Sequence, residues 1–340
     1  MQILPDQADA SIKKLATRAK WGVQMTGILN DFQLDHFINF TVKWKKSYHS
    51  EEEVQKRAKI WKENKKEIDE ENKKARGYKL GENLFTDMDD DEKAKYVMDI
   101  NTANAGDEAI KKIAKRGKRA AITYVGELKD WRRPAWMPAI RDQGSCGSCY
   151  AFAAINAIEV QWNSLGHTAQ FSEQQIVDCT GDNYGCGGGW PERVFNYSYY
   201  YGNAGRGVYP YTGKKGVCRG TARSYIVSNW YHLTTLAQMV SYNYWYGPIA
   251  FSINVPSSLY SYVGGIFYPP QSTCTSIVNR GAHAMSIVGY GAQNGVPYWI
   301  VRNSWGASWG EGGYFRMRKG VNNCGMEKRG VYIPFVYGQS

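Results

Sequence analysis

All seven cysteines of this chain lie beyond residue 140, so any disulfide framework is confined to its C-terminal part. The odd count predicts three bridges and one free thiol. Because structural bridges form in oxidising compartments, we expect a lysosomal, endosomal or secreted protein. The N-terminal residues lack the apolar core of a signal peptide, and we expect such a signal to be missing from this sequence. The cysteines are Cys146, Cys149, Cys179, Cys186, Cys218, Cys274 and Cys324.

Composition changes sharply near residue 120. Residues 31–74 are highly charged, contain neither Gly nor Pro and follow a helical pattern. Ser50 is expected to cap a helix there, and Glu53 to complete a capping box with it. One face of this helix repeats at spacings of three and four residues, so we expect it to pack against a second unit. That face consists of Val54, Arg57, Ile60, Trp61, Asn64, Ile68 and Asn72.

The part beyond residue 120 is rich in Gly, Tyr and Trp and predicts both helices and strands. Residues 150–164 form a mainly apolar helical pattern, and residues 172–179 begin another helix with Ser172 as its cap. From Ile249 onward, short β-rich runs separated by Gly and Pro predict a mostly antiparallel sheet or barrel. We therefore expect an α+β protein with a helical lobe, a β lobe and a cleft between them.

The net charge of +11 raises the question of nucleic-acid binding. The basic residues are mixed with acidic ones or scattered, without a basic stripe interleaved with aromatic residues, so no nucleic-acid partner is expected. No stretch approaches the roughly 20 apolar residues that cross a bilayer, and no membrane span is expected. Residues 111–125 begin with a basic run, which fits both a solvated linker and a proteolytic processing segment.

Cys146 and Cys149 stand three residues apart, a spacing also found in zinc and redox sites. A structural zinc site needs four ligands, and the chain has one such cysteine pair and no two histidines at the required spacing. A redox pair follows a buried strand, whereas a loop rich in Pro and Gly precedes Cys146. The remaining interpretation is a thiol nucleophile: Cys149 begins an apolar helix, whose N-terminal amides stabilise a thiolate. Metal and cofactor are therefore expected to be absent.

CGSCY, at residues 146–150, resembles the active-site pattern of papain and the cathepsins. His283 and Asn303 lie 134 and 154 residues beyond Cys149, in the order that this family shows. Two further stretches resemble the propeptides of cathepsin L-like proteases: the ERFNIN-type series Glu53, Arg57, Ile60, Trp61, Asn64, Ile68 and Asn72, and the series Gly81, Asn83, Phe85 and Asp87. The resemblance covers residues 31 to about 335.

This resemblance implies a papain-like two-lobe fold, with a helical left lobe and a barrel-like antiparallel right lobe, preceded by a helical inhibitory prodomain. It divides the chain into an N-terminal extension (1–30), a propeptide (31–120) and a peptidase domain (121–340). The propeptide tail would run through the cleft in the direction opposite to a substrate. Its removal would activate the enzyme, with a cleavage site between about 111 and 127.

The resemblance also assigns catalytic roles. Cys149 would attack the peptide carbonyl as a thiolate paired with the His283 imidazolium, giving an acyl-enzyme. Asn303 would orient the imidazole under the shield of Trp305. Gln143 would donate its side-chain amide to the oxyanion, beside the backbone amide of Cys149.

Bridges and substrate contacts follow from the same resemblance. Parity alone leaves fifteen pairings of six cysteines. The family pattern implies Cys146–Cys186, Cys179–Cys218 and Cys274–Cys324. The residues expected to contact substrate are Gly147, Gly188, Gly189, Trp190, Pro191, Ser252, Gly281, Ala282, Trp305, Trp309 and Arg329.

Three positions depart from the family pattern. Tyr150 replaces the commoner Trp, and little effect on the chemistry is expected. Ala282 replaces Asp or Asn beside the catalytic histidine, which would shift the pH profile of activity. Arg329 falls at the floor of the S2 pocket, where it would favour an acidic or polar P2 residue. The alternative is that Arg329 points into water or pairs with Glu327 or Glu192.

The sequence as a whole predicts a cysteine endopeptidase made as a zymogen and activated at acid pH. Asp87 and the acidic run 87–92 would be the trigger, because paired carboxylates are neutralised by acid; a solvated helix start is the alternative for the rest of that run. Protein or peptide substrates and the chain's own propeptide are the expected partners, with cystatin-like inhibitors as further candidates, and a monomer is expected. The rival functions are a catalytically silent binding protein and a Cys-His acyltransferase. Asn39 and Asn196 lie in glycosylation sequons.

Overall fold

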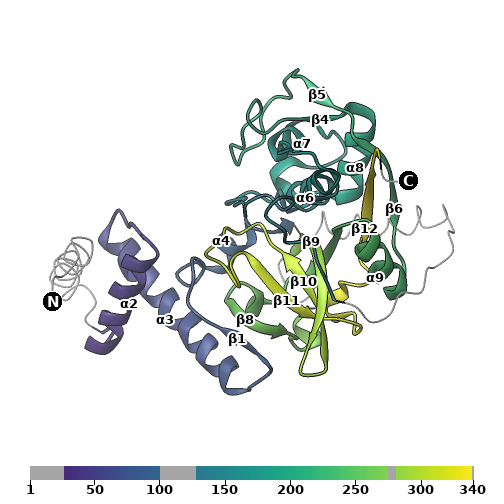
Figure 1. Ribbon diagram of the computed structural model, residues 1–340. Helices are drawn as coiled ribbons and strands as arrows, with labels where there is room; N and C mark the ends of the chain where they lie inside the picture. The colour runs from purple at the N-terminus through teal and green to yellow at the C-terminus, as the bar shows by residue number, and fades with distance from the viewer. Residues whose placement is uncertain (1–26, 100–127, 275–280, 339–340) are drawn as a thin grey trace, which may run out of the picture.

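Two helices, α2 (Asp31–Lys43) and α3 (Glu51–Lys73), form the N-terminal part of the structure and stand to one side of the remaining chain (Figure 1). The computed structural model describes residues 27–99, 128–274 and 281–338. Ser50 caps α3 as expected, because its hydroxyl accepts from the amide of Glu53 at 3.2 Å. The predicted capping box is wrong in its second half: the Glu53 carboxylate accepts from the amide of His49, one residue before the cap.

A small apolar core joins α2 to α3. Phe37 and Trp61 are almost completely buried, with ring centroids 5.5 Å apart. The apolar side chains recur at helical spacing on both helices, so each helix turns one stripe toward the other. This core comprises Leu29, Leu34, Phe37, Ile38, Phe40, Val54, Ala58 and Trp61.

The chain then returns along α3 toward the C-terminal part. It forms β1 (Tyr78–Leu80), α4 (Asp90–Ala94) and β2 (Met98–Asp99), and β1 and β2 both pair with strands of the large sheet. The polar side chains of α3 hold this returning segment through its backbone. Asn72 bonds both the amide and the carbonyl of Leu80 at 2.9 Å, and Asn64 donates to the carbonyl of Thr86 at 2.9 Å.

The helical lobe contains α6 (Cys149–Ser164), α7 (Glu173–Cys179) and α8 (Pro191–Tyr201). Both helices predicted there, 150–164 and 172–179, are confirmed to within one residue. Ser172 caps α7 as expected, accepting from the amide of Gln175 at 3.0 Å. Nearly every residue of α6 is buried, which is why its sequence is apolar around the whole circumference.

The second lobe is a sheet in the order β1-β8-β11-β10-β9-β7-β12-β6, to which β2 and β3 add by pairing with β9. Its ladders are antiparallel except for β11 with β8, so the predicted mostly antiparallel sheet is confirmed. Its strands beyond β1 and β2 are β3 (Lys129–Asp130), β6 (Val227–His232), β7 (Ile249–Asn254), β8 (Tyr262–Phe267), β9 (Gly281–Gln293), β10 (Val296–Arg302), β11 (Tyr314–Arg318) and β12 (Tyr332–Val336).

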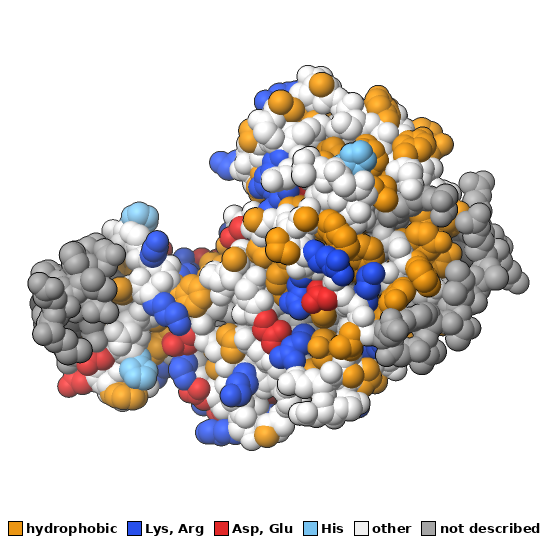
Figure 2. Space-filling model, in the orientation of Figure 1, with side chains coloured by type: hydrophobic (Ala, Val, Ile, Leu, Met, Phe, Trp, Pro, Cys, Tyr) orange, Lys and Arg blue, Asp and Glu red, His pale blue; other side chains and the backbone are white. Residues whose placement is uncertain are grey.

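The remaining elements are short. Helix α9 (Leu236–Trp245) precedes β7, and β4 (Asn203–Ala204) and β5 (Arg223–Ser224) form a separate ribbon. Single 3-10 turns occur at Gly185–Gly187, Ser257–Leu259, Gln271–Cys274 and Asn323–Gly325. No helix within the described ranges has both the length and the apolar character to cross a bilayer. Figure 2 shows a hollow between the α2–α3 end and the upper, helical lobe, with acidic and basic side chains intermixed on this face.

Candidate active site

Cys149 is the first residue of α6 and lies where the two lobes meet. Its thiol is free, its side chain is fully buried, and its Sγ accepts from the amide of Ala284 on β9 at 3.4 Å. Burial raises the pKa of the Cys149 thiol to about 11, although the neighbouring backbone amides of Ala284 and Tyr150 lower it. In this covered state the sulfur is therefore protonated at neutral pH.

His283, on β9, is oriented by Asn303, which follows β10. The imidazole Nε2 lies 2.7 Å from the Asn303 side-chain oxygen. That atom is the oxygen, because it also accepts from the amide of Ser304 at 2.8 Å. In the neutral ring Nε2 therefore carries the proton, and Nδ1, which makes no hydrogen bond within the described residues, is free to accept one.

Trp305 covers this His283–Asn303 pair. Its indole stacks on the imidazole with ring centroids 4.6 Å apart. Burial lowers the pKa of His283 to about 4, while the bond to Asn303 acts in the opposite direction. The histidine is therefore neutral in the covered site.

Gln143 lies in the loop that leads to α6, with its side-chain amide held in one orientation. Its Oε1 accepts from the hydroxyl of Ser304 at 2.5 Å, so its Nε2 is the outward donor. That Nε2 donates to the carbonyl of Cys146 at 2.8 Å and to the carbonyl of Tyr96 at 3.0 Å. A carbonyl oxygen of the N-terminal segment therefore occupies the position that a developing oxyanion would need.

The segment that contains Tyr96 covers the site. Strand β2 pairs with the start of β9, with Met98 opposite Ala282, and Met98 is only 1% exposed. Gly281 has no room for a side chain because the carbonyl of Met98 lies against it. A Cβ on Gly147 would lie 2.9 Å from the carbonyl of Val97 and 2.6 Å from that of Cys186. The close approach of this backbone explains why glycine stands at both positions.

The three bridges in the structure are Cys146–Cys186, Cys179–Cys218 and Cys274–Cys324, the same pairing that the resemblance implies. The first ties the loop before α6 to the turn before α8. Within the described ranges, no group of three or more His, Cys, Asp and Glu side chains is arranged to hold a metal ion.

The residues expected to line the S2 pocket come from the start of α8, from β7 and β9, and from the segment before β12. Trp190 and Ser252 are buried, and the Ser252 hydroxyl has no hydrogen-bond partner within the described residues. Arg329 is half-buried; its guanidinium donates to the side-chain oxygen of Asn254, and its carbonyl accepts from the Ser252 amide at 3.3 Å. Pro191 is the first residue of α8.

The two acidic partners considered for Arg329 differ in their surroundings. The Glu327 carboxylate accepts from the indole of Trp299 at 2.9 Å and from the amides of Gly320 and Asn322. Glu192 is buried near the start of α8, and burial raises the pKa of its carboxyl to about 7. The Glu327 carboxylate is thus already held by neutral donors.

The other expected substrate residues have local structural roles. Gly189 has no room for a side chain because the Asn183 side chain packs against it, and Gly188 has a φ of 122°, which favours glycine. Trp309 is fully buried, and its indole donates to the carbonyl of Tyr260 at 3.0 Å.

The segment 81–87, which resembles the second propeptide motif, connects α3 to the surface of the C-terminal part. The Asn83 side chain donates to the carbonyl of Tyr260 at 2.7 Å, and the buried ring of Phe85 packs against Tyr260 and Trp305 at centroid distances of 5.2 and 5.1 Å. Asp87 is buried and pairs with Lys46 at 2.5 Å.

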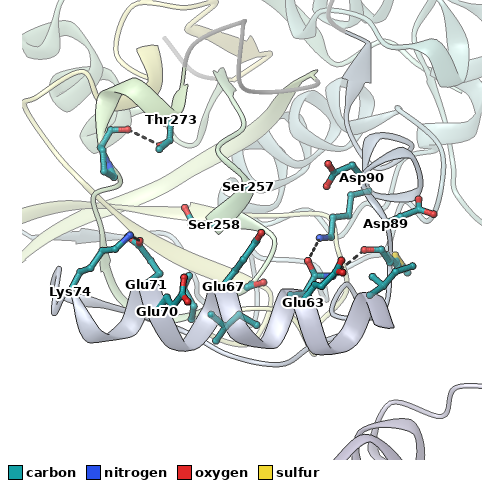
Figure 3. Close-up of a pocket in the computed structure, with 18 of the residues that line it drawn as sticks. Glu63, Glu67, Glu70, Glu71, Lys74, Asp89, Asp90, Ser257, Ser258 and Thr273 are labelled. Carbon is teal, nitrogen blue, oxygen red and sulfur yellow. Dashed lines mark hydrogen bonds and ion pairs between the residues drawn. The ribbon is translucent and has the colours of Figure 1, made fainter. Parts of the chain in front are cut away.

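An open pocket of about 490 Å³ lies between α3 and residues 257–273 (Figure 3). Acidic side chains of α3, including Glu63, Glu67 and Glu70, line it opposite Ser257 and Ser258. Ile68 of α3 nevertheless belongs to the same buried cluster as Leu259 and Tyr262 of the C-terminal part.

Two carboxylates of the acidic run, Asp89 and Glu92, are paired with basic residues of α3. Arg57 binds Glu92 through two bonds of 2.6 and 2.7 Å, and Lys56 binds Asp89 at 2.8 Å, so these pairs lie within the propeptide itself. Asp89 is also the N-cap of α4 and forms a capping box with Glu92. The predicted helix start and the predicted ion pairs are thus both present.

Sequence reasoning missed several residues of this site. The carbonyl of Tyr96 and the side chains of Met98, Ser304 and Tyr211 contact the predicted residues, yet none of them carries a local motif. Their positions depend on contacts between distant parts of the chain. The basic run 111–125, the cleavage region and most of the extension 1–30 lie outside the described residues.

Comparisons with known proteins agree with this geometry. The sequence family described as "Papain family cysteine protease" matches residues 125–334, and the "Cathepsin propeptide inhibitor domain (I29)" matches residues 37–92. The thiol protease aleurain of Arabidopsis thaliana is 37% identical over 298 residues, covering 85% of this chain and 81% of that protein. The cathepsin L-like proteinase of Fasciola hepatica is 36% identical over 304 residues, covering 83% and 89%.

Solved proenzymes have the same fold. The digestive procathepsin L2 proteinase from the larval midgut of Tenebrio molitor superposes with a TM-score of 0.77 at 31% identity, over 89% of this chain and 99% of that one. The recombinant stem bromelain precursor gives a TM-score of 0.75 at 29% identity, over 91% of this chain and 100% of that one.

Proposed function

We propose, on the premise that this chain belongs to the papain family of cysteine proteases, that Cys149 and His283 form its catalytic pair. The family assignment and the attached propeptide make the protein a cysteine endopeptidase synthesised as a zymogen. The observation that carries the proposal is the bond from His283 Nε2 to Asn303, which leaves Nδ1 available as the base.

In the uncovered site the reaction proceeds from these groups. His283 takes the proton of Cys149, and the thiolate attacks the peptide carbonyl carbon. The oxygen becomes negative and is stabilised by the Gln143 side-chain amide and the Cys149 backbone amide. The imidazolium then protonates the leaving amine, and a water molecule activated by the neutral imidazole hydrolyses the thioester.

Covering by the propeptide explains why the zymogen is inactive. With water excluded, the ion pair is disfavoured, since burial raises the pKa of Cys149 and lowers that of His283. The carbonyl of Tyr96 also accepts a hydrogen bond from the Gln143 side-chain amide, so this donor is not available to an oxyanion. Removing the segment restores both the thiolate and the oxyanion donor.

Hydrolysis of a fluorogenic dipeptide substrate by the matured protein tests this assignment. The expected result is turnover by the wild type and none by Cys149→Ala. Transfer of the acyl group to an amine in preference to water would identify an acyltransferase. A folded wild type without activity toward either acceptor would show a silent homologue.

Activation at acid pH is part of the proposal, because the propeptide is held by carboxylates that acid neutralises. Incubating the purified precursor at about pH 4 to 5, where carboxylates titrate, is expected to yield the mature enzyme. A precursor that stays intact and inactive there contradicts self-activation.

The S2 pocket is proposed to take a long side chain with an acidic end. Met98 of the propeptide packs in the same buried cluster as Ala282, so the pocket suits an apolar stem there. Arg329, bonded to Asn254, and the Ser252 hydroxyl, which has no hydrogen-bond partner among the described residues, supply polar groups. Glutamate at P2 combines both requirements.

A peptide library varied at P2 tests the pocket. The wild type is expected to cleave Glu at P2 at least as well as Leu, and Arg329→Met to lose the Glu substrates selectively. A preference for Leu or Phe over Glu in both enzymes would remove the hypothesis.

Several wider assignments are also proposals. We divide the chain at about residues 30 and 120, with cleavage between about 111 and 127. The three bridges favour a lysosomal, endosomal or secreted location. Asn39 and Asn196 are exposed and available for glycans. We further propose a monomer that cystatin-like inhibitors recognise at the cleft.

A further inference from the structure

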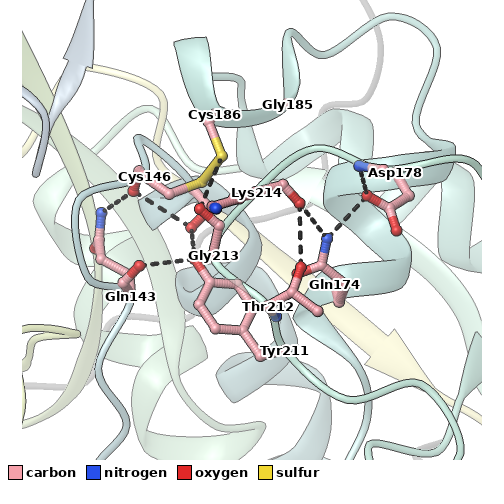
Figure 4. The surroundings of a disulfide bond; sticks show 12 residues. Gln143, Cys146, Gln174, Asp178, Gly185, Cys186, Tyr211, Thr212, Gly213 and Lys214 are labelled. Atoms are coloured by element: carbon pink, nitrogen blue, oxygen red, sulfur yellow. Dashed lines mark hydrogen bonds between the residues drawn. A yellow bond between two sulfur atoms is a disulfide. The ribbon is translucent and has the colours of Figure 1, made fainter.

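Tyr211, a residue outside the catalytic group, holds the loop that carries it. The Tyr211 hydroxyl donates to the backbone carbonyl of Gln143 at 2.8 Å and lies 2.7 Å from the hydroxyl of Ser148. Gln143 and Ser148 are the two ends of the loop before α6. Figure 4 shows the Tyr211 hydroxyl directed at Gln143, beside the bridge between Cys146 and Cys186.

The direction of these hydrogen bonds follows from the available protons. A carbonyl can only accept, so the single proton of the Tyr211 hydroxyl is directed at Gln143. The Ser148 hydroxyl must therefore be the donor to Tyr211. This chain of bonds runs from Ser148 through Tyr211 to Gln143.

Ser148 is the N-cap of α6, and its side chain makes no capping bond. Its backbone, at φ −88° and ψ 14°, lies outside the extended region from which a capping serine reaches the helix amides. The amides of Ala151 and Phe152 instead bond the Ser148 carbonyl, at 2.9 and 3.3 Å. The Ser148 hydroxyl therefore joins the end of the loop to Tyr211 without competing for these amides.

We propose that Tyr211 is a positioning residue for the peptidase reaction: its hydroxyl joins the two ends of the loop 143–148 and so fixes the position of Gln143. This inference rests on the proposed function of Cys149 and Gln143. The Tyr211 ring is well supported for the role, because it packs edge-on against Phe152 of α6 with centroids 5.0 Å apart.

The chain provides a matched control two residues earlier. Tyr209 is buried, and its hydroxyl donates to the carboxylate of Asp178 at 2.8 Å, away from the loop 143–148. Replacing either tyrosine by phenylalanine removes one hydroxyl from a half-buried or buried site. Only Tyr211→Phe releases Ser148.

Kinetics of the matured variants test the proposal. Because losing a direct oxyanion donor costs 10²–10³ in kcat, we expect the indirect loss in Tyr211→Phe to be about tenfold, with KM changed less than about twofold. Tyr209→Phe is expected to lower the melting temperature without this loss of kcat.

Two further outcomes separate the explanations. If Tyr211 acts through Gln143, the double variant Gln143→Ala with Tyr211→Phe should lose little more kcat than Gln143→Ala alone. Tyr211→Phe behaving like Tyr209→Phe in kcat overturns the inference, as does a fully additive loss in the double variant. An inactive wild type refutes the proposed function instead.

Discussion

The side-chain amide of Gln143 donates to the carbonyl of Tyr96, which stabilises the covered site. On the proposed function, the same donor is free for the oxyanion once the covering segment is removed. Ser304 holds the other end of the amide, which fixes the orientation of this donor in the covered state.

Gln143→Ala is therefore expected to reduce kcat/KM of the matured enzyme by about 10²–10³, the usual loss for one oxyanion donor. A fluorogenic dipeptide assay with active-site titration measures this. Gln238→Ala, at an exposed cap of α9, is the control and should leave the rate unchanged. A loss of less than about twofold in Gln143→Ala would exclude a role in transition-state stabilisation.

At the scale of elements, helix α3 supports the segment that enters the cleft. Its polar side chains bond the backbone of residues 80–88, so the segment is held although it has little regular structure of its own. The Arg57 guanidinium bonds both the Glu92 carboxylate and the carbonyl of Asp87, which joins α3 to the start of α4.

Arg57→Ala is expected to destabilise the zymogen by about 1–3 kcal/mol, the range for a charged hydrogen-bonding group that leaves its partners unsatisfied. Calorimetry of the precursor in the Cys149→Ala background measures the change without self-cleavage. Lys66→Ala removes an exposed pair with Glu70 at 3.9 Å and should change stability by less than about 0.5 kcal/mol. Equal effects of the two substitutions would show that α3 is not held by Arg57.

At the scale of the whole molecule, acid weakens the covered state through two kinds of group. Burial lowers the pKa of His283 from its ordinary 6.5 to about 4, so the uncovered state binds more protons between these values. The contribution of His283 to the stability of the covered state is thus fully present above pH 6.5 and is lost as the pH falls toward 4. Burial raises the pKa of the Glu92 carboxyl, but the bonds from Arg57 outweigh burial and hold this pKa below its ordinary value. The stability that the Arg57–Glu92 pair supplies is therefore lost as the pH falls below the ordinary range of carboxylates.

The melting temperature of the Cys149→Ala precursor is therefore expected to fall as the pH is lowered from 7 to 4. Adding His283→Asn should flatten the part of this dependence between pH 6.5 and 4, because the substituted side chain does not titrate. A melting temperature that is constant over this range, or an unchanged slope in the double variant, would contradict the linkage to His283.

Local sequence was sufficient for much of this molecule. The helix N-terminus before Cys149, the amphipathic face of α3 and the β-rich runs after Ile249 are periodic or positional patterns, which short-range sterics and burial impose on the chain. The single free thiol followed from parity, whereas the bridge pairing required the family resemblance. The amide that the Glu53 carboxylate binds was predicted wrongly, because this long, flexible side chain can reach the amide of either Ser50 or His49.

The sequence by itself thus determined which residues carry the chemistry: a thiol at the head of an apolar helix, a distant histidine and asparagine, and a charged helix ahead of them. Only the tertiary structure decided what those groups contact. The Tyr96 carbonyl on Gln143, the Met98 side chain beside Ala282 and the Tyr211 hydroxyl between the loop ends join residues 47 to 184 positions apart. Such contacts depend on how the whole chain packs, and no local periodicity encodes them.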